Sequence, residues 1–312
     1  MTLPQPSPRT VWLFPGQGME RPRMGLALAE EFPAARALLQ LAGEEAQVDA
    51  FRLLRRGGPD LQRTAVLQPL LTAVSLGVAL ALRQAGHAPD AVAGHSLGEI
   101  AAWSAAGGVP PEDAVRLAGA RGRCMQEAAR TRSGAMLAIL ADESALDEAR
   151  RAAAAGGTVD LAAHNAPEEW VLTGTRSALE AAARVAPSKW LDVSGPWHSR
   201  LMAGAETALA IALARVPRPP LRCELWCNRT GRPAASDALP TLIAEQLTHP
   251  VRWAETLAGL AGPHTRFVTV GPGRVLRGLL RKNLGDGPIV LTTEHPEDLQ
   301  RTVTALRERT TP

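Results

Sequence analysis

The pentapeptide Gly94-His95-Ser96-Leu97-Gly98 constrains the fold of this chain more than any other segment. An apolar strand is expected directly before it, over residues 88–93, and a helix of small residues directly after it, over 99–106. In a G-x-S-x-G turn between a strand and a helix, the glycines let neighbouring backbone approach closely, and the serine hydroxyl is held above the sheet. The first amides of the helix lie nearby and favour negative charge. The segment therefore predicts that Ser96 is a nucleophile.

Apolar strands alternate with helices through most of the chain, which predicts a mostly parallel sheet covered on both faces. One of these helices is expected to begin near Pro69, because a proline in the first helical turn gives up an N–H that has no partner there. Further strands are expected at 11–14, 222–226, 266–270 and 289–292, and helices at 24–31, 33–45, 69–83, 111–129, 200–215, 237–246, 275–282 and 297–309.

Residues 131–195 follow a different rhythm, with the order β-α-β-β-α-β that is typical of a ferredoxin-like unit. The predicted elements are a strand at 135–141, a helix at 143–154, strands at 159–163 and 170–174 joined by a turn at 165–167, a helix at 177–185 and a strand at 189–193. We therefore expect a small ferredoxin-like domain over 131–195, inserted into a large α/β domain formed by 1–130 and 196–312.

Composition narrows the class of protein further. The 312 residues are 46% hydrophobic and 21% charged, which excludes a disordered chain. Three cysteines form no disulfide framework, and Cys223 and Cys227 have no nearby Cys or His pair to complete a zinc site, so no metal is expected. The net charge of +3 comes without a dense basic tract, which argues against a nucleic-acid partner.

The most apolar run, residues 65–82, also contains Gln68, Thr72 and Ser75, which favours a buried core helix over a membrane span. Residues 1–10 lack the charged and apolar segments of a signal peptide. We therefore expect a soluble, cytoplasmic protein without a membrane partner.

A serine nucleophile needs a base, which is normally a histidine. His95 is adjacent to Ser96 and is expected to be a packed or hydrogen-bonded neighbour. His198 lies where the small domain returns to the large one, which is where a cleft would form. Spacing alone does not separate His198 from His164 or His249.

Several further motifs occur in one order over residues 11 to about 283, and together they resemble the malonyl-CoA:acyl carrier protein transacylases and the acyltransferase domains of polyketide synthases. The resemblance implies an α/β fold in which a hydrolase-like, mostly parallel sheet is flanked by helices and carries a ferredoxin-like insertion. The motifs are Phe14-Pro15-Gly16-Gln17-Gly18, Gly94-His95-Ser96-Leu97-Gly98-Glu99, Arg121-Gly122, Ser133-Gly134-Ala135-Met136, His198-Ser199, Gln246 to Pro250-Val251-Arg252-Trp253, and Gly271-Pro272-Gly273.

The resemblance assigns catalytic roles at matching positions. Ser96 would attack the thioester of malonyl-CoA, and His198 would act as general base and then as general acid. The backbone amides of Gln17 and Leu97 would form the oxyanion hole, a contribution of about 3–4 kcal/mol per donor. A backbone carbonyl near the position of His249 would orient His198, and this contact does not depend on the His249 side chain, which replaces the asparagine often found there.

Arg121 carries the expected substrate specificity. Its spacing alone would place it on a solvated helix face with Arg116 and Arg123. The resemblance instead makes it the group that binds the free carboxylate of the acyl chain, because a guanidinium fork matches a carboxylate with two parallel hydrogen bonds. Acetyl and fatty acyl groups lack that carboxylate and would be selected against.

The choice between malonyl and a substituted malonyl group stays open in the sequence. Leu97 and Trp197 stand where methylmalonyl-specific relatives tend to carry Gln and Ser, and a bulky Trp197 would leave little space for an α-methyl group. Gly195-Pro196-Trp197 nevertheless departs from the commonest malonyl pattern. Asn165 is expected either to help bind the acyl carboxylate or line the acyl pocket, or else to form a turn.

The expected reaction is ping-pong transfer from malonyl-CoA to the phosphopantetheine thiol of an acyl carrier protein, in fatty-acid or polyketide biosynthesis. The enzyme needs no cofactor of its own, would act in trans as a monomer, and its basic balance suits an acidic carrier protein. One alternative is a serine hydrolase or thioesterase that uses Asp286 and His295. A second alternative is a non-catalytic scaffold that binds carrier proteins.

Overall fold

A six-stranded sheet forms the centre of the computed structural model, which describes residues 8–308. Its strand order is β11-β10-β1-β2-β7-β8, and all neighbours are parallel except β7 and β8. The predicted mostly parallel α/β sheet is therefore confirmed. The strands are β1 (Arg9–Phe14), β2 (Ala91–Gly94), β7 (Glu224–Cys227), β8 (Arg232–Pro233), β10 (Thr265–Thr269) and β11 (Ile289–Thr292).

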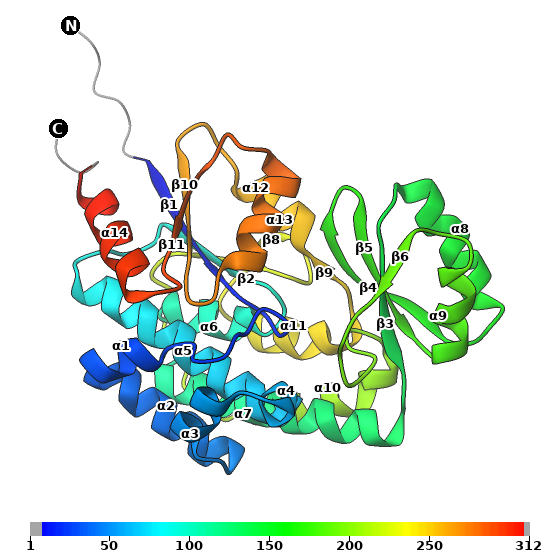
Figure 1. The fold of residues 1–312 in the computed structure, drawn as a ribbon, viewed down its shortest axis with the longest axis horizontal. Coiled ribbons are helices and arrows are strands. Elements are labelled where there is room, and N and C mark those ends of the chain that lie inside the picture. The colour runs from blue at the N-terminus through cyan, green and yellow to red at the C-terminus, as the bar shows by residue number, and fades with distance from the viewer. Residues whose placement is uncertain (1–7, 309–312) are drawn as a thin grey trace, which may run out of the picture.

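Helices cover this sheet on both faces, with α2, α5, α6 and α7 below it and α12 and α13 above it in Figure 1. Short 3₁₀ turns at Arg200–Met202 and Gln246–Thr248 precede α10 and β9. The helices are α1 (Leu26–Glu31), α2 (Pro33–Ala46), α3 (Ala50–Arg56), α4 (Pro59–Gln62), α5 (Thr64–Gln84), α6 (Gly98–Ala105), α7 (Pro111–Thr131), α10 (Ala203–Leu213), α11 (Leu239–Glu245), α12 (Trp253–Leu260), α13 (Arg274–Leu284) and α14 (Pro296–Arg307).

The predicted start of the apolar helix was wrong, because α5 begins at Thr64 and Pro69 lies inside it. Proline there removes one intrahelical hydrogen bond, but almost every side chain from Val66 to Ala79 is buried and the packing outweighs that loss. Among residues 8–308, α5 is the one helix whose length and mean hydropathy of 2.0 would allow a membrane span, yet 83% of that window is buried inside the protein.

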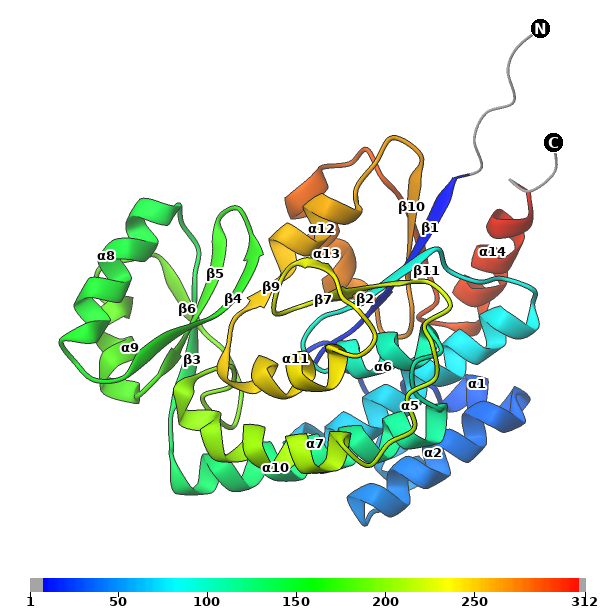
Figure 2. The ribbon, with the colours of Figure 1, turned by 180° about the vertical axis from the view of Figure 1, so that it is seen from behind.

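A second, five-stranded sheet forms a separate lobe, seen at the left in Figure 2. Its order is β6-β3-β5-β4-β9, the first four strands pair antiparallel, and α8 and α9 pack against them over a core that includes Leu137, Leu172 and Leu179. This is the predicted ferredoxin-like arrangement, although its boundaries at 131 and 195 remain a prediction. The elements are β3 (Ala135–Ile139), α8 (Glu143–Ala154), β4 (Val159–Ala166), β5 (Glu169–Gly174), α9 (Arg176–Ala183), β6 (Ser188–Trp190) and β9 (Val251–Arg252).

Two details of this lobe differ from the sequence prediction. The expected turn at 165–167 lies further on, at residues 167–168, because β4 stays paired with β5 up to Ala166 through two irregularities in register. In addition, β9 from the far end of the chain pairs in parallel with β4. The small sheet therefore includes a strand from the part of the chain that follows β7 and β8 of the large sheet. The segment just before β9 lies close to both sheets as a result.

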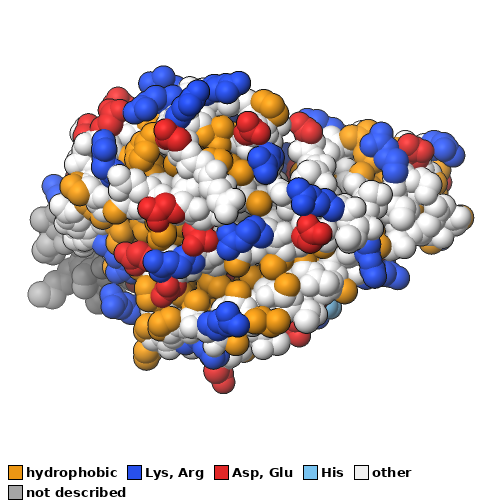
Figure 3. Space-filling view, turned by 90° about the horizontal axis from the view of Figure 1, so that it is seen from below, with side chains coloured by type: hydrophobic (Ala, Val, Ile, Leu, Met, Phe, Trp, Pro, Cys, Tyr) orange, Lys and Arg blue, Asp and Glu red, His pale blue; other side chains and the backbone are white. Residues whose placement is uncertain are grey.

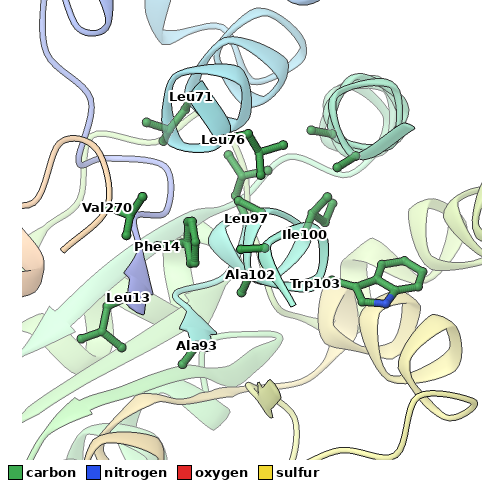
Figure 4. Packing of buried hydrophobic residues seen from close by; sticks show 14 of the residues in the cluster. Leu13, Phe14, Leu71, Leu76, Ala93, Leu97, Ile100, Ala102, Trp103 and Val270 are labelled. Atoms are coloured by element: carbon green, nitrogen blue, oxygen red, sulfur yellow. The ribbon is translucent and has the colours of Figure 1, made fainter. Parts of the chain in front are cut away.

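The buried core lies around the strand–helix unit that carries the pentapeptide. Figure 4 shows Leu97 beside Phe14 of β1 and below Leu71 and Leu76 of α5, with Ile100 on the side of α6 away from Phe14. All five side chains are almost completely excluded from solvent. The turn between β2 and α6 is therefore anchored by packing on both sides.

The protein surface mixes charges of both signs. Basic and acidic side chains alternate across the face seen in Figure 3, with apolar side chains between them. On α7, Arg116 pairs with Asp113 at 2.9 Å and Arg123 with Glu45 at 3.1 Å, and both arginine side chains are 52% exposed. The expectation that Arg116 and Arg123 lie on a solvated helix face is confirmed.

Candidate active site

The turn that carries Ser96 is as tight as its two glycines suggest. Ser96 has a φ of 51°, in the left-handed region that residues other than glycine rarely adopt. A Cβ on Gly94 would lie 1.9 Å from the carbonyl carbon of Gly98, and a Cβ on Gly98 would lie 2.3 Å from the carbonyl oxygen of Phe14. The sharp turn therefore requires glycine at both positions, and it presents the Ser96 hydroxyl to the cavity described below.

His198 provides a base at hydrogen-bond distance from that hydroxyl. Its Nε2 lies 2.8 Å from the Oγ of Ser96, and its Nδ1 lies 2.7 Å from the backbone oxygen of Gln246. Because a carbonyl oxygen only accepts, Nδ1 carries the proton and Nε2 is free to accept from the serine. The backbone of His249 also hydrogen-bonds this imidazole, so the orienting carbonyls lie in the segment where the sequence analysis expects one.

The environment of His198 keeps its imidazole neutral. Burial, and next the positive charge of Arg121, lower its pKa from 6.5 to about 3. A neutral imidazole can accept the serine proton across the whole range around neutral pH. The pair is therefore poised for nucleophilic attack by Ser96.

Arg121 is buried beside the nucleophile, with 1% of its surface exposed. Its Nη1 donates to Oε1 of Gln68 at 3.0 Å, and its Nη2 donates to Oε1 of Gln246 at 2.9 Å and to Oγ of Ser96 at 3.1 Å. Burial lowers its pKa to about 10, which still leaves it charged at neutral pH. Among residues 8–308 no carboxylate lies within ion-pair distance of this guanidinium, so a buried positive charge faces the cavity without a counter-ion in direct contact.

Two backbone amides are available for a developing negative charge. Gln17 lies in the turn after β1, and Leu97 directly precedes the first residue of α6. Neither backbone N–H has a hydrogen-bond acceptor within the described part of the chain. The Ser96 amide, by contrast, is occupied, because it donates to Oδ1 of Asn228 at 2.7 Å. The Gln17 and Leu97 amides are thus the ones that remain open.

Ser96, His198, Arg121 and Gln17 line a cavity of about 420 Å³ between the two sheets. The α/β part contributes Ser96, Gln17 and Arg121, and the ferredoxin-like lobe contributes the side that faces them. Further lining residues include Met125, Met136, Ala163, Asn165, Glu169, Val171, Leu191, Trp197, His198 and Leu279. A cavity of this size holds a short acyl chain together with part of a thioester arm.

The remaining sequence candidates have clear positions. Trp197 is buried and lines the cavity. Asn165 also lines it, and its Oδ1 accepts from Nε2 of His95 at 2.9 Å. The His249 side chain is not brought to the cavity: its Nδ1 contacts the backbone oxygen of Glu245 at 2.9 Å. Its backbone, and not its imidazole, is what meets His198.

Three polar residues of the site were missed by the sequence analysis. Asn228 binds the Gly94 carbonyl through Nδ2 at 2.6 Å and the Ser96 amide through Oδ1, so it clamps both sides of the turn. Gln246 and Glu99 connect that turn to Arg121. Burial raises the pKa of Glu99 to about 7. A charged residue inside the apolar helix 98–105 was the one local signal that could have pointed to this network.

The groups of the alternative hydrolase are not assembled. His295 caps α14 and contacts the guanidinium of Arg21 at 2.9 Å. Asp286 pairs with Arg281 at 3.0 Å, and its side chain is largely exposed. Neither lines the cavity around Ser96, so this pair is not its acid and base. Within residues 8–308, no group of three or more His, Cys, Asp or Glu side chains is arranged to hold a metal ion.

Comparison with known proteins agrees with this geometry. The model of the acyl transferase domain family matches residues 11–300. The chain belongs to this acyl transferase family. The malonyl CoA-acyl carrier protein transacylase of Bacillus subtilis (strain 168) is 34% identical over 311 aligned positions, which cover 96% of this chain and 98% of the relative. The enzyme of the same name from Escherichia coli (strain K12) is 33% identical, with 87% and 91% covered.

Solved structures of the acyl transferase family match the whole fold. The acyl-carrier-protein S-malonyltransferase of Bartonella henselae has a TM-score of 0.89 and 32% identity, and the match covers 96% of this chain and 99% of that one. A malonyl-transacylase solved in complex with its type II polyketide acyl carrier protein has a TM-score of 0.88 and 30% identity, covering 95% and 99%. The fold inferred from the sequence is therefore that of the family.

Proposed function

We propose that this acyl transferase moves a malonyl group from malonyl-CoA to the phosphopantetheine thiol of an acyl carrier protein, by way of an ester on Ser96. The observation that carries the proposal is the buried guanidinium of Arg121, which contacts the nucleophile and has no carboxylate partner within residues 8–308. An unpaired buried charge is costly, and a carboxylate on the acyl group would compensate it. The names of the relatives support the same substrate.

In the first half-reaction, the Ser96 Oγ attacks the thioester carbonyl carbon while its proton passes to Nε2 of His198. The carbonyl oxygen becomes negative and accepts from the amides of Gln17 and Leu97. When the tetrahedral intermediate collapses, the C–S bond breaks and His198 returns its proton to the departing CoA sulfur. The malonyl carboxylate stays on Arg121, which holds the ester in the cavity.

The second half-reaction reverses these steps with a different thiol. The carrier thiol gives its proton to His198 and attacks the Ser96 ester, and the released serine oxygen recovers the proton. The relatives include both malonyl CoA-acyl carrier protein transacylases and a transacylase bound to a polyketide carrier protein, which supports a role in fatty-acid or polyketide biosynthesis. Because one chain supplies Ser96, His198 and Arg121, we propose that it works as a monomer. We also propose that it acts in the cytoplasm, as expected from the sequence.

A panel of acyl-CoAs tests the proposal. The protein is incubated with malonyl-, acetyl- and hexanoyl-CoA, and intact-mass measurement followed by peptide mapping locates any adduct. We expect one malonyl group on Ser96, far less acetyl or hexanoyl, and no adduct on the Ser96→Ala variant. Addition of a holo acyl carrier protein should move the group to the carrier. Equal labelling by acetyl-CoA would contradict the substrate, release to water instead of the carrier would indicate a thioesterase, and no adduct at all would indicate a scaffold.

A further inference from the structure

Three parts of the active site meet at Gln246. Its backbone oxygen accepts from His198, its side-chain Oε1 accepts from Nη2 of Arg121 at 2.9 Å, and its Nε2 donates to the backbone oxygen of Ser96 at 3.1 Å. Gln246 is almost completely buried. The base, the nucleophile turn and the arginine are therefore all tied to one residue.

These contacts work only if the Gln246 amide faces one way. A glutamine amide has one accepting oxygen and one donating NH₂ of almost the same shape, and its partners decide which is where. An arginine only donates, and a carbonyl oxygen only accepts. If the amide were reversed, its NH₂ would oppose the Arg121 guanidinium and its oxygen would oppose the Ser96 carbonyl.

Glu99 contacts the same amide from the first turn of α6. One of its carboxylate oxygens accepts from Nε2 of Gln246, and the other accepts from the backbone N–H of Asn228 at 2.9 Å. Its side chain is fully buried. Both carboxyl oxygens act as acceptors in these contacts, so Glu99 draws the Gln246 NH₂ to its own side and leaves the Gln246 oxygen toward Arg121.

This arrangement also keeps the two buried charges apart. No ion pair joins Glu99 and Arg121 within residues 8–308, because the Gln246 amide lies between them. Glu99 thus makes no direct bond to the Arg121 guanidinium, whose buried Nε–H has no acceptor among residues 8–308. When a substrate carboxylate competes for Arg121, the bond from Arg121 to Gln246 weakens, and Glu99 is then the main group that fixes the amide.

We infer that Glu99 is a positioning residue that fixes the Gln246 amide, so that Arg121 faces Ser96, where the substrate carboxylate would replace the contact between them. The inference rests on the proposed function and adds a residue that controls the specificity of that same site. Glu99 does not touch the reacting atoms. Its effect should therefore appear in the choice between acyl groups.

Glu99→Gln tests the inference with a minimal change of shape. The new amide has a single oxygen for the donors that meet Glu99, which are the Gln246 NH₂, the Asn228 N–H and the Cys227 thiol. The backbone N–H is fixed, so the new amide turns its oxygen to Asn228 and its NH₂ to Gln246, and Gln246 reverses to accept from it. Arg121 then faces an NH₂ group and loses its orientation. Glu127→Gln, an exposed change on α7, is the matched control.

The readout is the ratio of kcat/KM for Ser96 acylation by malonyl-CoA to that by acetyl-CoA, measured first on the parent. Malonylation of the parent establishes the proposed function separately. We expect Glu99→Gln to lower the ratio about tenfold or more, because a buried N–H of Arg121 then faces the NH₂ group of Gln246 and has no acceptor. Gln246→Met should lower it similarly, and the double variant no further, since both changes break one link. Glu127→Gln should leave the ratio unchanged.

Two results would overturn the inference. If Glu99→Gln lowers kcat/KM equally for malonyl-CoA and acetyl-CoA, and also lowers the Tm, Glu99 serves only the stability of the fold. If its effect on the ratio adds to that of Gln246→Met, Glu99 does not act through Gln246.

Should Glu99→Gln not fold, Glu99→Asp takes its place. This variant keeps both acceptor oxygens but is one methylene too short to reach both donors, so the same fall in the ratio is expected. An unchanged ratio in Glu99→Asp or in Gln246→Met rejects the link.

Discussion

The guanidinium of Arg121 donates a hydrogen bond to the hydroxyl oxygen of Ser96 at 3.1 Å, although 25 residues separate them in the chain. The group proposed to select the acyl chain is thus in contact with the atom proposed to carry it. A carboxylate that replaced this contact would lie about one short acyl chain from the ester carbon. Such a short reach is what the proposed three-carbon diacid requires.

Arg121→Ala should therefore change which acyl group is transferred. Loss of two charged hydrogen bonds to the substrate carboxylate should lower kcat/KM for malonyl-CoA by about 100- to 1000-fold. Acetyl-CoA makes no such bonds, so its kcat/KM should stay within a few-fold. Both kcat/KM values are measured by stopping the acylation reactions at set times and determining the acylated fraction by intact mass. Arg116→Ala, on the exposed face of the same helix, should change neither. Malonyl transfer at the parent rate in Arg121→Ala would reject the role of Arg121.

The sequence alone predicted the candidate nucleophile but not its partners. Ser96 is predicted by a local pattern, because two glycines and a strand–helix turn are consecutive in the chain. His198 lies 102 residues away and Arg121 is on another helix, so neither could be chosen from spacing, and only the family resemblance selected them. Asn228 lies in none of the motifs, and Gln246 lies in one of them but was given no role of its own. Their roles depend on how β7 and the turn before β9 pack against α6.

The fold shows the same division. The order β-α-β-β-α-β and the alternating strands follow from local periodicity, and the structure contains them. The short elements α3, α4, α12, β8 and β9 were not predicted, because such short segments show little periodicity. The placement of β1 between β10 and β2 also could not be predicted, since parallel pairing joins strands that are far apart in the chain.

The buried His198 imidazole should make stability depend on pH in a defined direction. Its pKa is about 3 in the folded protein and 6.5 when unfolded, so between these values the unfolded chain binds more protons. The free energy of unfolding should therefore fall as the pH drops below 6.5. His198→Gln lacks this titration. The free energy of unfolding of the parent, relative to that of the variant, should therefore fall by roughly 1 kcal/mol per pH unit as the pH is lowered from 6 to 4.

Urea unfolding of both proteins at pH 7.5, 6, 5 and 4 measures this difference. Glu99 acts in the opposite sense between pH 4.5 and 7, because its raised pKa makes the folded state bind more protons there. That contribution is common to both proteins and cancels in the difference. A difference that stays constant with pH would mean that His198 is not held neutral by its surroundings.

The glycine at position 98 should not tolerate even one methyl group. A Cβ there would lie 2.3 Å from the backbone oxygen of Phe14, which β1 holds in the central sheet. Gly98→Ala should lower the free energy of unfolding by about 2–3 kcal/mol and lower acylation of Ser96 with it. Gly278, in the exposed middle of α13, has no atom within 4 Å of such a Cβ. Gly278→Ala should instead stabilise the protein by about 0.5–1 kcal/mol. Similar values for the two variants in thermal and urea unfolding would contradict the steric argument.

Trp197 should decide whether an α-methyl group is accepted. The indole is buried, lines the acyl cavity and precedes the catalytic His198 in the chain. Trp197→Leu opens space beside the ester, so kcat/KM for methylmalonyl-CoA relative to malonyl-CoA should rise about tenfold or more, the discrimination that one methyl group typically provides. Trp170→Leu is the matched control, because Trp170 stacks on His164 away from the cavity. If the parent already takes both substrates equally, or if both variants shift the ratio alike, the indole does not set this limit, and the substrate is a substituted malonyl group as readily as malonyl itself.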